Sequence, residues 1–314
     1  MKFTHFEQAA KFTDAAAELI HLSHGTVSNV VSGRMQALAY SIEQCQRFYL
    51  PRAEQILIDK PFDSFKDLIR LPYDNIALLT ETYYRDRPHS DTVMITLAFN
   101  GRSSLVKRVN LVEDPITDPE RGFYFINLLH FPFTEHEAKW IVGSAMAFLN
   151  LKPTEGRGVS IEILPDEYYS WHRRALDKMQ PNPELADAFA RIEVMDLKED
   201  AISVANLCVL LNLHNVKTTE RQPPKPLNIK RTKRGKLPLY SYKVLVVDNE
   251  TWDKPEERQS TGDGHAFRSH LRRGHIRRLH ASDRRVWVRA TYVHGAIPGF
   301  VEKEYQVKDK RATA

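Results

Sequence analysis

The residues best suited to chemistry stand together in the C-terminal third of the chain. The stretch 265–289, HAFRSHLRRGHIRRLHASDRRVWVR, holds four histidines and eight arginines. Imidazole exchanges protons near neutral pH, and guanidinium binds phosphate charge through several donors at once. This mixture predicts a surface that holds a polyanion, a metal-independent ribonuclease-like centre, or a solvated hairpin.

A ribonuclease-like centre would use two histidines as general base and general acid, with arginines stabilising charge on the phosphorus. The candidate catalytic residues are His270, His275, Arg273 and Arg277. The histidine spacing follows neither a helical nor a strand period, so it does not by itself define a site. The neighbouring arginines repel a divalent cation and no CxxC pair exists, so we expect no metal site. No Walker loop or GxGxxG motif is present, and we expect no cofactor.

Strand alternation favours the binding surface. If HIRRLH and RRVWVRA pair as strands, Arg285, Trp287 and Arg289 form a basic–aromatic–basic row. Guanidinium groups suit phosphates, and an indole suits base stacking. A second basic segment, NIKRTKRGK at 228–236, could extend the same footprint. The predicted nucleic-acid-binding residues are Lys230, Arg231, Lys233, Arg234, Lys236, Arg272, Arg273, Arg277, Arg285, Trp287 and Arg289.

The charge distribution agrees with a polyanion partner. Residues 1–220 hold 23 Lys+Arg and 30 Asp+Glu, whereas residues 221–314 hold 22 and 10. Phosphate neutralisation supplies most non-specific nucleic-acid affinity, and it needs a concentrated basic region of this kind. The same asymmetry suits docking onto an acidic protein, so the expected partner is nucleic acid or an acidic protein.

The elements that position these residues change in type along the chain. Residues 5–70 read as helices, and residues 73–165 as an antiparallel sheet with strands in NIALLTETYY, TVMITLAFN, SLVKRVNLVED, GFYFINLLHF and GVSIEILP. Within this region we expect a helix at 134–151, because Thr134 and Glu137 have capping-box spacing. Further helices are expected at about 166–179, 183–192 and 198–213.

Residues 217–238 read as an extended basic connector, because three prolines in four positions oppose a helix. Strands follow in YSYKVLVVD, in a hairpin turning at 281–283, and in GFVEKEYQV, with a mobile loop expected at 249–264. The predicted fold class is α+β: a helical N-terminal region, a central antiparallel sheet with helices, and a small basic β-rich C-terminal module.

The expected domains are an α+β body at 1–216 (helical at 1–72, mixed at 73–216), the connector at 217–238 and the basic module at 239–314. The body is expected to provide structure or homo-oligomerisation. Cys45 and Cys208 lie in apolar contexts that predict buried, reduced thiols. No apolar run reaches membrane-spanning length and no signal-peptide pattern opens the chain, so we expect a cytoplasmic protein without membrane contact.

Two resemblances add to these patterns. AELIHLSHGTVSNVVSGRM, residues 17–35, resembles the helix-turn-helix of LacI-type repressors, with His21 in place of the usual turn glycine. The segments NLCVLLNLHNV, PPKPLNIKRTKRGKLPLYSYKVLVV, RSHLRRGHIRRL, RVWVRATYVHG and GFVEKEYQV resemble a family of uncharacterised bacteriophage and prophage proteins. That resemblance implies a phage accessory protein in the bacterial host cytoplasm and no particular activity. An inhibitor that binds a bacterial host protein is a further alternative.

Overall fold

The structure is a computed structural model of the 314-residue chain. It describes residues 6–25, 28–51, 65–83, 91–110, 115–132, 138–143, 145–153, 158–170, 174, 183–247, 268–272, 275–279, 284–288, 291–293 and 297–300. The chain divides into two compact units. Residues 1–212 and 217–246 form the first, and residues 213–216 and 247–314 form the second.

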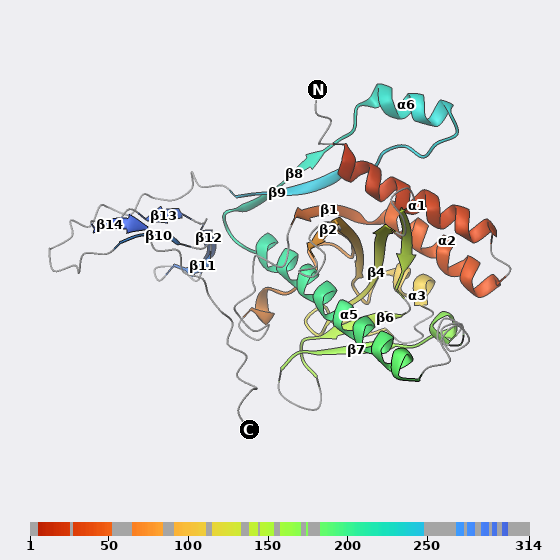
Figure 1. The fold of residues 1–314 in the computed structure, drawn as a ribbon, viewed down its shortest axis with the longest axis horizontal. Helices are drawn as coiled ribbons and strands as arrows, with labels where there is room; N and C mark the ends of the chain where they lie inside the picture. Colours follow the sequence, from red (N-terminus) through yellow and green to blue (C-terminus); the bar gives the residue numbers. More distant parts are fainter. Residues whose placement is uncertain are drawn as a thin grey trace. The chain divides into compact units, whose positions relative to one another are not determined.

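Within the described residues, one mixed sheet of nine strands organises the first unit (Figure 1). The strand order is β7-β6-β4-β3-β2-β1-β9-β8, and β5 pairs with β4. Pairings from β2 to β7 are antiparallel, whereas β1 lies parallel to both β2 and β9. The strands are β1 (Gln46–Pro51), β2 (Asn75–Tyr83), β3 (Asp91–Phe99), β4 (Gly122–Pro132), β5 (Ala138–Val142), β6 (Met146–Asn150), β7 (Ser160–Leu164), β8 (Val216–Arg221) and β9 (Tyr242–Val247).

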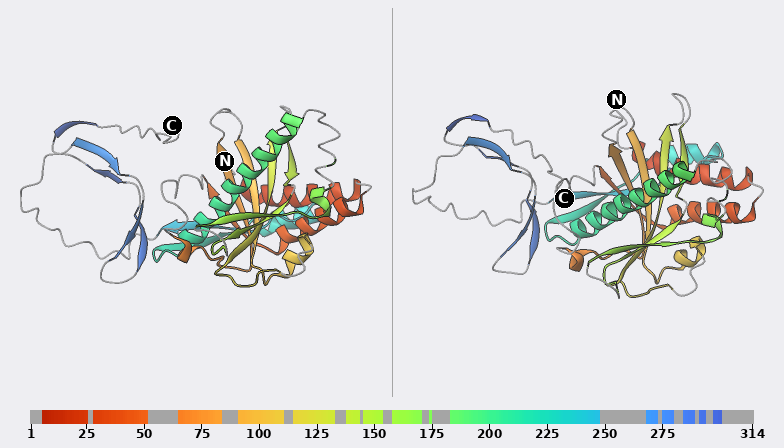
Figure 2. Two further views of the ribbon diagram at one scale, coloured as in Figure 1. Left: turned by 90° about the horizontal axis from the view of Figure 1, so that it is seen from below. Right: turned by 60° about the horizontal axis from the view of Figure 1, so that its bottom comes forward.

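Helices cover both faces of this sheet (Figures 1 and 2). On one face, the hairpin of α1 (Glu7–Gly25) and α2 (Asn29–Gln44) packs with α3 (Ser104–Asn110), and its core includes the paired residues Ile95 and Leu128. The next pair, Thr96 and Asn127, points to the opposite face because side chains alternate along a strand. There α5 (Pro183–Leu211) crosses the strands. The α+β prediction is confirmed, although the sheet is mixed.

Each face also buries a polar contact. Beneath α2, the Nη1 group of Arg34 lies 2.6 Å from Asp166 Oδ2 and donates to the Val109 carbonyl at 2.5 Å. Beneath α5, Asn127 Nδ2 donates to Asp200 Oδ2 at 2.5 Å. Both contacts join segments that are distant in sequence, so they help to fix the helices on the sheet.

Several predicted elements are confirmed. Strands β2, β3, β4, β7 and β9 occur where alternation or β-branched runs predicted them. Cys45 and Cys208 are buried free thiols, as their apolar surroundings indicated.

Four predictions for the body were wrong. Residues 46–51 form β1 instead of extending the N-terminal helices, and residues 134–151 contain β5 and β6 instead of a helix. β6 is buried at every position, so its continuous apolar run cannot be told from a buried helix by periodicity. The expected strand SLVKRVNLVED begins with α3, whose buried Leu105, Val106 and Val109 have helical spacing.

The fourth error concerns α5. Two helices were expected at 183–192 and 198–213, yet one helix runs from Pro183 to Leu211. The intervening residues contain neither glycine nor proline, so nothing in the backbone stops the helix between them.

The second unit carries small strands. β10 (Arg268–Arg272) pairs with β13 (Thr291–Val293) and β14 (Ile297–Phe300). β11 (His275–Arg278) pairs antiparallel with β12 (Arg285–Val288), which confirms the strands of the predicted hairpin. The His214 amide donates to the Arg285 carbonyl at 3.0 Å, so the segment after α5 belongs to this unit.

Some predicted elements lie outside the described residues. They are the loop at 249–264, residues 52–64 of the helical region, the hairpin turn at 281–283, and most of the helix at 166–179 and of GFVEKEYQV. Among the helices that the structure describes, none is long and apolar enough to cross a membrane.

Candidate nucleic-acid interface

A short basic helix follows β8 and corrects the prediction of an extended connector. α6 (Lys225–Lys233) begins directly after Pro224 and has Pro226 in its first turn. Amides of the first helical turn have no partner four residues back, so proline costs no hydrogen bond there. The prolines therefore start this helix instead of preventing it.

Glycine ends the helix sharply. The Gly235 amide donates to the Thr232 carbonyl at 3.0 Å, and the Lys236 amide donates to the Arg231 carbonyl at 3.1 Å. These two bonds form a Schellman motif, which requires a left-handed residue at its turn. Gly235 has φ of 68°, a conformation that glycine adopts without steric cost. The chain consequently turns back along the helix.

Side chains of α6 hold the returning segment. Asn228 makes two hydrogen bonds to the backbone of buried Leu239, one from its Nδ2 to the carbonyl at 3.0 Å and one from the amide to its Oδ1 at 2.8 Å. Arg231 Nε donates to the Leu237 carbonyl at 2.9 Å. The Tyr240 amide donates to Thr13 Oγ1 of α1 at 3.1 Å. We call residues 225–241 the α6 lobe; these bonds fix it as a shaped part of the first unit.

The outer surface of the α6 lobe is strongly cationic. Residues 225–236 include six Lys or Arg and no Asp or Glu. Five of the six are exposed, and Arg231 is half-buried. Burial raises the pKa of Asp14 on α1, and the nearby charges of Arg231, His130 and Lys236 oppose that shift. Cations placed this close together produce a local positive potential that attracts anions. The five exposed residues are Lys225, Lys230, Lys233, Arg234 and Lys236.

The structure brings together the first group of predicted binding residues. Lys230, Arg231 and Lys233 lie on α6, Arg234 caps it, and Lys236 follows.

The second predicted group lies in the other unit. Arg272 ends β10, Arg277 lies on β11, and Arg285 and Trp287 lie on β12; Arg273 and Arg289 fall outside the described residues. A single footprint shared with the α6 lobe therefore remains a prediction.

The hairpin register adds a residue that sequence reasoning missed. Trp287 pairs with Ile276, and Arg285 pairs with Arg278. Residues paired across strands share a face, so Arg278 lies on the same face of the hairpin as Arg285. Arg278 was not among the predicted binding residues, because only the register between the two strands places it beside Arg285.

The candidate catalytic histidines lie on different sheets. His270 is on β10 opposite Val293, and His275 is on β11 opposite Val288. Arg273 is outside the described residues. The ribonuclease-like centre thus remains a prediction. Among the residues that the structure does describe, no group of three or more His, Cys, Asp or Glu could hold a metal ion.

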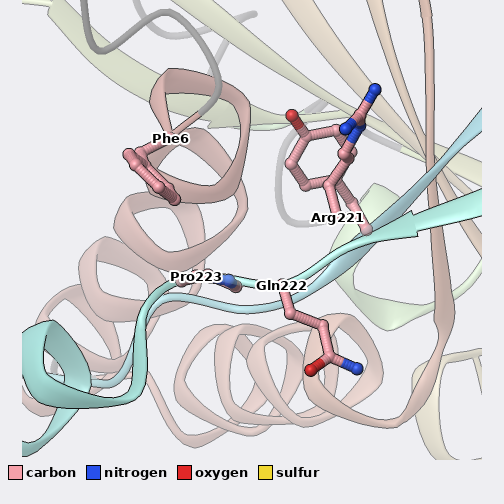
Figure 3. A pocket seen from close by; sticks show the side chains of 5 residues that line it. Phe6, Arg221, Gln222 and Pro223 are labelled. Atoms are coloured by element: carbon pink, nitrogen blue, oxygen red, sulfur yellow. The ribbon is translucent and has the colours of Figure 1, made fainter.

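A pocket beside the α6 lobe had no sequence signal. It encloses about 200 Å³ and is lined by Phe6, Arg221, Gln222, Pro223 and Tyr242 (Figure 3). These residues come from the start of α1, the end of β8 and β9, so only the fold brings them together. The pocket combines two aromatic rings with one guanidinium group.

The helical hairpin of α1 and α2 differs locally from the helix-turn-helix pattern. That resemblance places a turn at His21, but α1 continues through His21 to Gly25. α2 buries Val31, Met35 and Leu38 in the core beneath it.

Comparisons of the chain with protein-family models, with curated proteins and with solved structures gave no match.

Proposed function

We propose that the protein binds nucleic acid through the α6 lobe. The observation that carries this proposal is the group of exposed cations from Lys225 to Lys236, with no acidic residue among them. They lie on and just after a helix that Asn228 and Arg231 hold against the returning chain. A fixed array loses less conformational entropy on binding than a flexible basic tail would lose. Repeated phosphates are the partner whose charge spacing can engage several of these residues together.

The hairpin of the second unit provides a second contact in this proposal. Arg278 and Arg285 pair across the hairpin, and the sequence predicts Trp287 on the face of Arg285. An aromatic residue beside cations is typical of surfaces that hold unstacked bases. The α6 lobe is the principal contact because all of its cations lie within one short segment.

The resemblance of the C-terminal third to phage and prophage proteins supports a biological setting for this activity. We propose an accessory role in the cytoplasm of an infected bacterium, where nucleic acid of host and phage is available.

The proposal is tested by replacing charges on the lobe. The variant Lys230→Gln/Lys233→Gln/Arg234→Gln removes three exposed cations without touching Asn228 or Arg231, which brace the lobe. Fluorescence anisotropy with labelled DNA and RNA oligonucleotides at low salt should show affinity lower by about tenfold or more.

A matched control removes the same charge elsewhere. Lys66, Arg102 and Lys107 are exposed and lie outside the α6 lobe. Their combined replacement by glutamine should reduce affinity far less than the lobe variant does. Equal losses from both triple variants, or no binding by the unaltered protein, would reject the α6 lobe as the binding surface.

A further inference from the structure

We infer that the pocket beside the α6 lobe receives one unpaired base of the bound strand, so that the preferred ligand is single-stranded nucleic acid. This inference rests on the proposed function and adds the strandedness of the ligand and the place where a base is held. The observation that supports this inference is that the residues lining an aromatic pocket are followed directly in the chain by the cationic helix α6.

Phe6 supplies the ring on which a base can stack, whereas Tyr242 is a buried part of the pocket wall. Tyr242 is 4% exposed, and its ring meets Tyr49 edge-on with centroids 6.4 Å apart. The Tyr49 hydroxyl in turn bonds to Glu81 Oε1 at 2.8 Å. Phe6 is half-buried at the start of α1 and lines the same pocket. Aromatic faces stack on any base, so such a pocket needs no particular sequence.

Arg221 gives the pocket its cation. Its side chain is exposed at the end of β8, and Figure 3 shows it on the same side of the chain as Phe6, whereas Gln222 points to the opposite side. Guanidinium both stacks on planar rings and forms paired hydrogen bonds to phosphate. In this inference Arg221 stacks on the base that the pocket holds.

The size of the pocket limits its occupant. A volume of about 200 Å³ is below the range of roughly 300–1,000 Å³ that is common for drug-sized ligands. One ring system such as a nucleobase suits it better than a larger ligand. A base in a duplex is stacked and paired and would have to be extruded first, which a single strand does not require.

The chain connects the pocket to the phosphate-binding helix. Only Gln222, Pro223 and Pro224 separate Arg221 from Lys225, the first residue of α6. Four residue steps span at most about 14 Å. A base in the pocket and phosphates along α6 would thus belong to neighbouring nucleotides of one strand.

An abasic probe separates the contribution of the bases to the binding affinity from that of the phosphates. Binding of the full chain is measured with a labelled oligothymidine and with a backbone of equal length whose sugars carry no bases. The unaltered protein should bind oligothymidine about 5- to 100-fold more tightly, as expected for stacking of one base. Phe6→Ala should lower that ratio by about fivefold or more while leaving abasic binding unchanged, and Phe6→Trp should preserve it.

Arg221→Gln provides a second variant at an exposed side chain, in case Phe6→Ala fails to fold; it should also reduce the ratio. Equal binding of the two probes by the unaltered protein overturns the inference, as does an unchanged ratio in folded Phe6→Ala or, failing that, in Arg221→Gln. The lobe variant should weaken binding of both probes. If it does so while the ratio is one, only the inference about the pocket fails; if neither probe binds, the proposed function fails as well.

Discussion

Arg34 shows how a single charged side chain can organise the core of this protein. Its side chain is 2% exposed, it bonds to Asp166 and to the Val109 carbonyl, and its guanidinium carbon lies 5.3 Å from the centroid of the Tyr168 ring. Burial lowers the pKa of Arg34, and the Asp166 carboxylate opposes that shift. α2 is thereby tied to α3 and to the segment that follows β7.

Removing the Asp166 carboxylate alone should destabilise the protein more than removing both Arg34 and Asp166. Asp166→Ala leaves a buried cation without its counter-charge, and we expect a loss of about 3 kcal/mol in the free energy of unfolding. Urea denaturation measures the loss. Arg34→Met/Asp166→Ala should recover part of it, because no buried charge remains; a double variant less stable than Asp166→Ala would contradict this account.

His130 predicts a pH dependence of stability. Its ring packs at a tilt against Trp140, with centroids 5.0 Å apart. Burial, with Lys11, lowers the pKa of His130 below 6.5, while Glu18 and Asp14 oppose the shift. The unfolded chain therefore takes up the proton first as pH falls, so this stability is present above about pH 6.5 and lost below it.

The thermal midpoint should consequently drop between pH 7.5 and pH 5.5 by more in the unaltered protein than in His130→Phe. Equal drops would show that another group is responsible.

At the scale of elements, the backbone conformation of a glycine determines whether its replacement by alanine stabilises or destabilises the helix. Gly235 has φ of 68°, whereas Gly33 lies exposed within α2 with open space around its Cα. Gly235→Ala should destabilise the α6 lobe by about 1 kcal/mol, and Gly33→Ala should stabilise α2 by roughly 0.5–1 kcal/mol. Hydrogen exchange of the α6 and α2 amides measures both changes; protection of α6 unchanged by Gly235→Ala would contradict the left-handed turn.

The elements also show what the sequence could predict. Alternation and β-branched runs located β2, β3 and β4, because these strands carry strong strand propensity. β6 was mistaken for a helix because a strand buried on both faces has no alternation to detect.

α6 was missed because its prolines were weighed as breakers, although their effect depends on position within the helix. The cluster of lobe cations was visible from composition alone. The pocket was not, because Phe6, Arg221 and Tyr242 meet only through the sheet and the α1 packing.

At the scale of the whole molecule, charge is unevenly distributed along the chain. The first 220 residues are net acidic and contain most of the buried core, while the excess of basic over acidic residues lies in 221–314. In the proposed function, this arrangement confines the attraction for polyanions to the α6 lobe and the second unit.

The salt dependence of binding tests the central claim most directly. Each phosphate contact on a single strand contributes about −0.7 to the slope of log K against log salt concentration. Loss of three contacts from the α6 lobe should therefore make the slope of Lys230→Gln/Lys233→Gln/Arg234→Gln shallower by about 2 than that of the unaltered protein. Parallel slopes for the two proteins would contradict binding of nucleic acid through the α6 lobe.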